Sequence, residues 1–234
     1  MPENKIQVLC TRPLSESLID TVRARGVAID TLSFIETEPI RTIEVQQEVE
    51  QALAKTAVVV FTSMTAVEAV ADYMDEKPDW RIYCIGGATQ RLVKQHFGEA
   101  SIAGTAHDAA ALAELIVDDD EGDEIIFFCG NQRREELPSL LEDNGLSLEE
   151  IVVYETVAVP RRVDKVYNGI LFFSPSAVDS FFSVNKVKEG TLLFAIGSTT
   201  AGAIKKHSVN KVVIGDEPGK EQLLEKMLEV FGKA

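Results

Sequence analysis

Cysteine is scarce in this 234-residue chain, which contains only three. Cys10, Cys84 and Cys129 are odd in number and lack CxxC spacing, which argues against a disulfide framework and against a metal site. Each cysteine ends an apolar run, a position typical of a buried free thiol. The sequence therefore predicts no bound metal, and it indicates a reducing compartment, which we take to be the cytoplasm.

Long apolar runs and an excess of basic residues are also missing. No stretch approaches the roughly 18–20 apolar residues of a membrane span, and the start MPENKIQVLC lacks the basic and apolar regions of a secretory signal. The chain has 23 Lys and Arg against 38 Asp and Glu, a formal net charge of −15. This balance argues against binding to nucleic acid or to an anionic membrane, since both need a basic surface. A small anionic ligand is still compatible with it, because charges more than about 10 Å away are screened at ordinary salt.

The acidic residues are densest at residues 118–124, where six of seven are Asp or Glu. This run lacks the spaced ligands of an EF-hand loop. We interpret it as a solvated linker rather than a calcium site.

What the sequence does contain is an internal repeat. Residues 58–117 align with 169–228 at an offset of 111 without a gap, so that VVVFTSMTAVEAV falls on GILFFSPSAVDSF. Residues 6–37 align with 125–156 at an offset of 119. The chain thus consists of two different segments, each present twice and in alternation. Repeats of this length and number are unlike those of a solenoid and indicate halves of α/β domains.

Short apolar runs alternate with helical patterns along the whole chain. Most of these runs are continuously apolar, as in parallel strands covered by helices on both faces. We therefore predict two doubly wound, flavodoxin- or Rossmann-like α/β domains of about five strands each. The ten expected strands are residues 6–10, 27–34, 57–61, 81–85, 99–103, 124–129, 149–154, 169–173, 191–196 and 210–214.

The order of the repeats suggests how the strands are shared between the domains. The segment that begins at residue 6 and its repeat carry two strands each, too few for a five-stranded sheet, so each domain must combine both kinds of segment. We expect domain 1 to consist of residues 1–36 and 161–234, and domain 2 of residues 41–154. The extended, proline-containing segments 37–40 and 155–160 would be the interdomain crossings, paired as a two-stranded ladder beside a cleft. A simpler pairing of consecutive segments remains the alternative.

Six turns that follow strands have the composition of anion-binding sites. Parallel sheets bind ligands beyond the carboxyl ends of their strands, where the N-termini of helices offer free N–H groups. Ser63 and its repeat equivalent Ser174 lie in such turns, as does Ser176. These serines either contact a ligand or act as ordinary N-caps. Arg12 directly follows the first strand and is our preferred cationic contact for a carboxylate, with Arg133 or Arg134 as candidates from the second domain.

The ordered strings TRP, VFTSMTAV, CIGGAT, VYET, FFSPSAV and AIGSTT cover nearly the whole chain, and the sequence resembles the uroporphyrinogen-III synthase family. The resemblance implies two α/β domains joined by a two-stranded ladder. It also implies a cofactor-free cyclising lyase that takes the linear tetrapyrrole hydroxymethylbilane, an octacarboxylate. This enzyme removes water, inverts ring D through a spiro intermediate and closes the macrocycle. By the same resemblance, the hydroxyl and N–H groups of Thr89, Thr199 and Thr200 contact the substrate. Thr89 and Thr200 are repeat equivalents, which fits either symmetric anion binding or shared helix capping.

Tyr154 is the candidate catalytic residue, because VYET enters the second crossing and the family has an important tyrosine here. A nearby general acid assists departure of the hydroxyl group. A phenol is a weak acid at neutral pH, so a hydrogen bond to the leaving hydroxyl is the expected role. The alternative is that the ring of Tyr154 only packs between the domains. Its repeat equivalent is Ile35, so packing at that position does not require a phenol.

Two other functions fit parts of the sequence. Two α/β lobes on a two-stranded hinge also describe a module that binds or senses a small anion without catalysis. A nucleotide-dependent transferase is disfavoured, because neither GxGxxG after the first strand nor a P-loop GKS or GKT is present. As an enzyme, the chain is expected to be a monomer. Any association with hydroxymethylbilane synthase, the preceding enzyme of the pathway, is expected to be transient.

Overall fold

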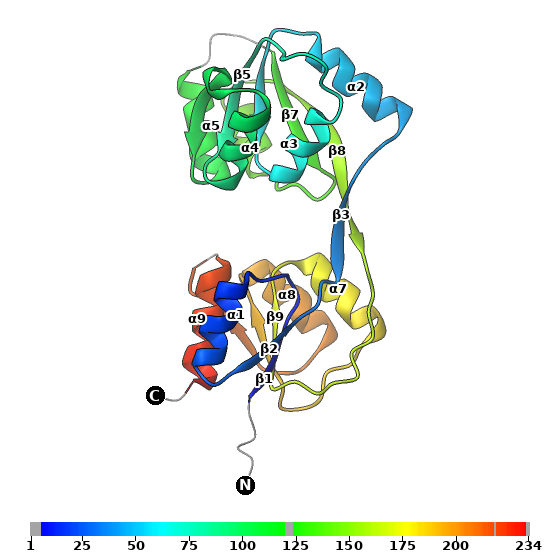
Figure 1. Ribbon diagram of the computed structural model, residues 1–234, viewed down its shortest axis with the longest axis vertical. Helices are drawn as coiled ribbons and strands as arrows, with labels where there is room; N and C mark the ends of the chain where they lie inside the picture. The colour runs from blue at the N-terminus through cyan, green and yellow to red at the C-terminus, as the bar shows by residue number, and fades with distance from the viewer. Residues whose placement is uncertain (1–5, 120–123, 218, 233–234) are drawn as a thin grey trace. The chain divides into compact units, whose positions relative to one another are not determined.

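The apolar runs form parallel strands in a computed structural model that describes residues 6–119, 124–217 and 219–232 (Figure 1). The chain divides into unit 1, which comprises Met1–Glu36 and Val157–Ala234, and unit 2, which comprises Thr37–Thr156. Of the acidic run interpreted as a linker, residues 120–123 lie outside the described residues. Within the described parts, no helix has the length and apolar character needed to cross a membrane.

Unit 1 contains a five-stranded parallel sheet in the order β11-β10-β9-β1-β2. Helices α1 and α9 bury Val22 and Leu224 on one face of this sheet, beside Cys10. Helices α7 and α8 bury Phe181 and Ile204 on the other face. The elements are β1 (Gln7–Cys10), α1 (Glu16–Ala24), β2 (Ala28–Thr31), β9 (Gly169–Phe172), α7 (Pro175–Val184), β10 (Leu192–Ala195), α8 (Ser198–His207), β11 (Val212–Ile214) and α9 (Lys220–Phe231).

Unit 2 contains the second sheet, in the order β3-β8-β7-β4-β5-β6. Val49, Val67 and Val93 from helices α2, α3 and α4 pack on one face of this sheet. Leu112 and Leu141 from α5 and α6 pack on the other. The elements are β3 (Ile35–Pro39), α2 (Ile43–Leu53), β4 (Ala57–Phe61), α3 (Met64–Ala71), β5 (Trp80–Ile85), α4 (Ala88–His96), a 3₁₀ turn (Glu99–Ser101), β6 (Ile102–Ala106), α5 (Ala109–Asp118), β7 (Ile125–Gly130), α6 (Glu136–Asp143) and β8 (Leu148–Ala158).

The two sheets have the same strand order once the repeats are matched. In unit 2 the order β6-β5-β4-β7-β8 places three strands of one repeat beside two of the other, and unit 1 has β11-β10-β9-β1-β2. Helices cover both faces of each sheet, which explains why most strands are continuous apolar runs. The predicted doubly wound α/β class is confirmed.

Strands β3 and β8 carry the chain across the boundaries of the two units. The N–H of Ile40 donates to the carbonyl of Val153, and the N–H of Val159 donates to the carbonyl of Phe34, each at 2.9 Å. Residue numbers rise along one strand as they fall along the other, so the two strands run antiparallel (Figure 1).

Two equivalent glycines end equivalent helices. Gly26 and Gly145 both have φ of +81°, a left-handed conformation that a side chain disfavours. Their N–H groups donate to the backbone carbonyls of Arg23 and Glu142, which are also repeat equivalents. The repeat that is visible in the sequence therefore extends to the backbone of the helix ends.

The position predicted for the strand at residues 99–103 is wrong. Residues Glu99–Ser101 form a 3₁₀ turn, and the strand runs from Ile102 to Ala106. The hydroxyl of Ser101 donates to the carbonyl of Phe97, which closes a local turn in place of a strand pairing.

The prediction of buried free thiols is confirmed for all three cysteines, which lie among the described residues. Their exposed fractions are 0% for Cys10 and Cys84 and 2% for Cys129. Burial raises the pKa of each thiol to about 11, so the thiols are protonated at neutral pH.

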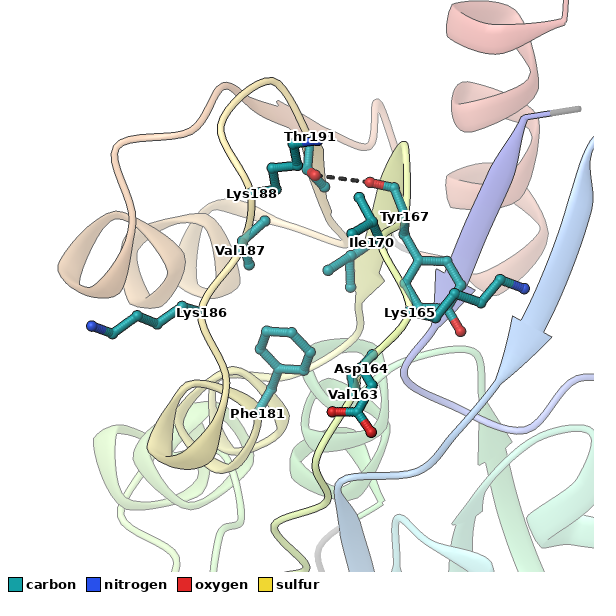
Figure 2. A pocket seen from close by; sticks show the side chains of 11 residues that line it. Val163, Asp164, Lys165, Tyr167, Ile170, Phe181, Lys186, Val187, Lys188 and Thr191 are labelled. Atoms are coloured by element: carbon teal, nitrogen blue, oxygen red, sulfur yellow. Dashed lines mark hydrogen bonds between the residues drawn. The ribbon is translucent and has the colours of Figure 1, made fainter. Parts of the chain in front are cut away.

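A charged cluster ties the segment before β9 to β2. The Nζ of Lys165 lies 2.6 Å from Oδ2 of Asp30, and the hydroxyl of Tyr167 donates to the same oxygen at 2.8 Å. The hydrogen bond from Lys165 and the one from Tyr167 lower the pKa of the Asp30 carboxyl. Figure 2 shows Lys165 and Tyr167 side by side on this segment.

We expect Asp30→Asn to make the protein less sensitive to acid. The pKa of Asp30 is lower in the folded chain, so its stabilising effect is present at neutral pH and is lost as the pH falls through that lowered value. The side chains of Asp30 and Lys165 are about half exposed, so solvent screening limits the loss of stability at pH 7 to about 1 kcal/mol or less. Urea unfolding should show the variant less stable than the wild type at pH 7 and nearly equal to it near pH 3. An equal difference at both pH values would rule out this role for Asp30.

Candidate active site

Each sheet has a point at which its strand order reverses, between β1 and β9 in unit 1 and between β4 and β7 in unit 2. Ligands of open α/β sheets bind at such points, beyond the carboxyl ends of the strands. The predicted site residues follow the ends of β1, β4, β5, β7, β9 and β10, apart from Tyr154, which lies within β8.

A cavity of about 370 Å³ lies at this end of unit 2. Thr62 and Ser63 line it after β4, His107 and Asp108 after β6, and Tyr154 from β8. Arg133 and Gly130 complete the side next to β7. Of the predicted residues, the structure thus brings Ser63, Arg133 and Tyr154 together around one cavity.

Tyr154 points into this cavity because of an irregularity in the pairing of β7 with β8. Cys129 pairs with Val152 but Gly130 pairs with Tyr154, so one residue of β8 is passed over. Such a bulge redirects a side chain. The ring then lies against Gly130, where an added Cβ would be 2.4 Å from Cε2 and Cζ. The backbone is held by the N–H of Asn131, which donates to the carbonyl of Tyr154 at 3.1 Å.

The phenol of Tyr154 is available for a ligand. The side chain is half-buried and packs against the core of unit 2. Its hydroxyl has no hydrogen-bond partner among the residues that the structure describes. Gly130 was not singled out from the sequence, because its contact with the ring depends on the bulge.

Arg133 is already paired with two carboxylates. Its Nη2 lies 2.7 Å from Oε1 of Glu150, its Nε contacts the other oxygen of Glu150, and its Nη1 lies 2.7 Å from Glu135. The hydrogen bond from Glu150, with a smaller contribution from Glu135, raises the pKa of Arg133. Arg134 is exposed. The substrate contact predicted for Arg133 therefore competes with an ion pair.

Ser63 and Ser174 act as N-caps, as the alternative interpretation of the sequence predicted, whereas Ser176 lies within α7. The Oγ of Ser63 accepts from the N–H of Ala66, and the Oγ of Ser174 accepts from the N–H of Ala177, both at 3.2 Å. Ser174 and Ser176 lie 3.1 Å apart through their hydroxyls. A capping hydroxyl can still donate its own hydrogen, so capping and ligand contact are compatible.

The three threonines differ in exposure. Thr89 and Thr200 are buried, at 6% and 3%, whereas Thr199 is exposed. All three lie in the first turns of α4 and α8, which begin at glycines that provide no side-chain cap. The backbone N–H groups of these turns are therefore better placed to contact an anion than the hydroxyls of Thr89 and Thr200.

Unit 1 presents its own set of groups at the carboxyl end of its sheet. Arg12 follows β1 and is exposed, and Thr11 donates to the carbonyl of Leu171 at 2.8 Å. Lys220, which the sequence analysis missed, begins α9. Both cations lie close enough to Cys10 to lower the pKa of its thiol, although burial dominates and raises it. Of these groups, Thr11 lies at the point between β1 and β9, through its hydrogen bond to Leu171.

Unit 1 has a hollow of about 160 Å³ at the opposite ends of its strands (Figure 2). It is lined by Val163, Tyr167 and Val187, among others, and the hydroxyl of Thr191 donates to the carbonyl of Tyr167 at 2.8 Å. None of the predicted site residues lines it. Among the described residues, no group of three or more His, Cys, Asp or Glu side chains could hold a metal ion.

Comparison with known proteins gives one consistent result. The family model described as uroporphyrinogen-III synthase HemD matches residues 16–225. The chain is 24% identical over 230 residues to a uroporphyrinogen-III synthase of Chlorobaculum parvum, covering 88% of this chain and 92% of the relative. It is 25% identical over 171 residues to that of Saccharomyces cerevisiae, covering 62% of each. The crystal structure of uroporphyrinogen-III synthetase from Helicobacter pylori 26695 shares the fold, with a TM-score of 0.64 at 16% identity over 96% of this chain and 99% of that one.

Proposed function

The chain belongs to the uroporphyrinogen-III synthase family, and we propose that Tyr154 assists its reaction as the hydrogen-bond donor to the leaving hydroxyl. The activity is that of a cyclising lyase of tetrapyrrole biosynthesis. Hydroxymethylbilane loses water, ring D is inverted through a spiro intermediate, and the macrocycle closes as uroporphyrinogen III. The family match over residues 16–225 is the observation that carries this function.

The first chemical step determines which charge the protein must stabilise. Departure of the hydroxyl leaves an azafulvenium cation, and the leaving oxygen gains negative charge until it takes up a proton. A positioned donor stabilises that developing charge. Support for Tyr154 comes from its phenol, which lines the cavity of unit 2 without a hydrogen-bond partner among the described residues.

The carboxylates of the substrate can be bound by hydrogen-bond donors without many cationic side chains. We propose that they contact the first turns of helices at Ser63, Thr89, Ser174, Ser176, Thr199 and Thr200, mainly through backbone N–H groups. Arg12 supplies a cation from unit 1. Arg133 contacts a substrate carboxylate by exchanging its exposed partner Glu135, while the pair with Glu150 stays in place.

The remaining expectations follow from the family. We propose that the reaction needs no cofactor, that the enzyme works as a monomer in the cytoplasm, and that any contact with hydroxymethylbilane synthase is transient.

The experiment that tests the function supplies freshly generated hydroxymethylbilane to the purified protein. Its products are oxidised, and the type I and type III isomers are separated chromatographically. We expect type III to form above the type I isomer, which arises by spontaneous closure. Folded protein that yields only type I would overturn the proposal and favour an anion-binding module.

A further inference from the structure

The net negative charge of the chain belongs entirely to one unit. Unit 2 has 8 Lys and Arg against 25 Asp and Glu, a formal net charge of −17. Unit 1 has 15 against 13, a formal net charge of +2. An octacarboxylate is therefore repelled by unit 2 as a whole, and its carboxylates meet a more favourable potential at unit 1.

Two cations lie at the carboxyl end of the unit 1 sheet. Arg12 lies two residues after Cys10, whose thiol donates to the carbonyl of Arg12 at 3.1 Å. Lys220 is the first residue of α9, and one turn later Leu223 and Leu224 pack in the same core cluster as Cys10. Among the described residues, neither cation has an ion-pair partner. This differs from Arg133 of unit 2, which two carboxylates already hold.

The repeat provides an internal comparison for these two positions. At the offset of 119, Arg12 corresponds to Asn131. At the offset of 111, Lys220 corresponds to Ala109, which begins α5 after the capping carboxylate of Asp108. The same fold is thus built in unit 2 without either cation, so neither Arg12 nor Lys220 is required by the architecture.

We propose that Arg12 and Lys220 form a carboxylate-binding site that captures acidic side chains of the linear tetrapyrrole on unit 1. This inference rests on the proposed function. It assigns different tasks to equivalent ends of the two sheets. Unit 1 binds the anionic periphery of the substrate, and unit 2 contributes Tyr154 to the chemistry.

The test replaces each cation by the residue found at the equivalent position of unit 2, giving Arg12→Asn/Lys220→Ala. Because unit 2 already carries these residues at the same fold positions, we expect the variant to fold, which thermal unfolding checks. Charge-assisted hydrogen bonds are strong, and losing two should raise KM by about tenfold or more while kcat stays within about twofold. The two single variants should each show part of the rise.

The matched control is Lys186→Asn/Lys206→Ala. It removes the same charge from exposed lysines of unit 1 that line a different hollow, at the ends of α7 and α8. Fluorescence anisotropy with uroporphyrin III, an octacarboxylate, provides a readout that does not depend on turnover. We expect its Kd to rise with KM in the Arg12/Lys220 variant, and the dependence of Kd on salt to become weaker.

The outcomes separate this site from the proposed function. If the wild type forms type III but the Arg12/Lys220 variant binds uroporphyrin III as tightly as the control, the site is wrong and the function stands. If the wild type forms no type III, the function itself fails. A similar loss of binding in both double variants would mean that only the net charge of unit 1 matters, which would also overturn the site.

Discussion

Tyr154→Phe should lower the kcat for type III formation by about 10- to 100-fold, because a hydrogen bond to a charged group is worth roughly 1.5–3 kcal/mol and each 1.4 kcal/mol is about tenfold in rate. The substitution removes only the hydroxyl, which has no hydrogen-bond partner among the described residues. The ring keeps its contact with Gly130. The free energy of unfolding should therefore change by less than about 0.5 kcal/mol. Steady-state rates of type III formation and urea unfolding of the same preparation measure both quantities.

Tyr73→Phe is the matched control for Tyr154→Phe. Tyr73 packs in the same core cluster of unit 2, just after α3, and does not line the cavity. Its loss of a hydroxyl should leave kcat unchanged. Wild-type turnover in Tyr154→Phe would remove Tyr154 from the mechanism, and an equal fall in both variants would assign the effect to packing.

The sheets were predictable because their strands are buried on both faces. Runs such as residues 57–61 and 169–173 are continuously apolar, and the structure places β4 and β9 there. The edge strand β6 was misplaced, since its sequence IAGTA has little apolar signal and alternates between exposed and half-buried residues. There the hydrogen bond between Ser101 and Phe97 decides the local structure. Strand β3, rich in Glu, Thr and Pro, was recognised as an extended crossing but not counted as a strand.

The site was only partly predictable, since its geometry depends on contacts between distant segments. The sequence placed Tyr154 at the end of a strand-like run, but the bulge that orients its ring is a property of the pairing of β7 with β8. The pairing of Arg133 with Glu150 was likewise invisible, because 17 residues separate them. Lys220 was detectable from the sequence, because the longer repeat aligns this cation with the uncharged Ala109. The contacts with substrate remain predictions.

Gly130→Ala should also reduce turnover strongly, through the position of Tyr154. A Cβ at Gly130 would lie 2.4 Å from Cε2 and Cζ of the Tyr154 ring and 2.9 Å from its hydroxyl oxygen, so the ring must move. Overpacking of this kind costs about 1–3 kcal/mol of stability. We expect kcat to fall by about tenfold or more, and Tyr154 fluorescence or an NMR signal of its ring to shift. Unit 1 tolerates Thr11 at the equivalent position, where the residue corresponding to Tyr154 is Ile35, so the fold itself does not require glycine here.

Turnover in Gly130→Ala can fall because the Tyr154 phenol moves or because overpacking destabilises the protein. A second glycine variant distinguishes these two causes. In Gly104→Ala the new Cβ would lie 2.6 Å from Leu115 and 2.8 Å from Tyr83, a comparable clash outside the cavity lining. That variant should lose similar stability and keep its kcat. If Gly130 acts only by positioning the phenol, Gly130→Ala/Tyr154→Phe should be no slower than the slower single variant, because contacting residues that share one function are not additive. A further fall in the double variant would show that Gly130 contributes independently of Tyr154, for example by letting the substrate approach the backbone at the end of β7.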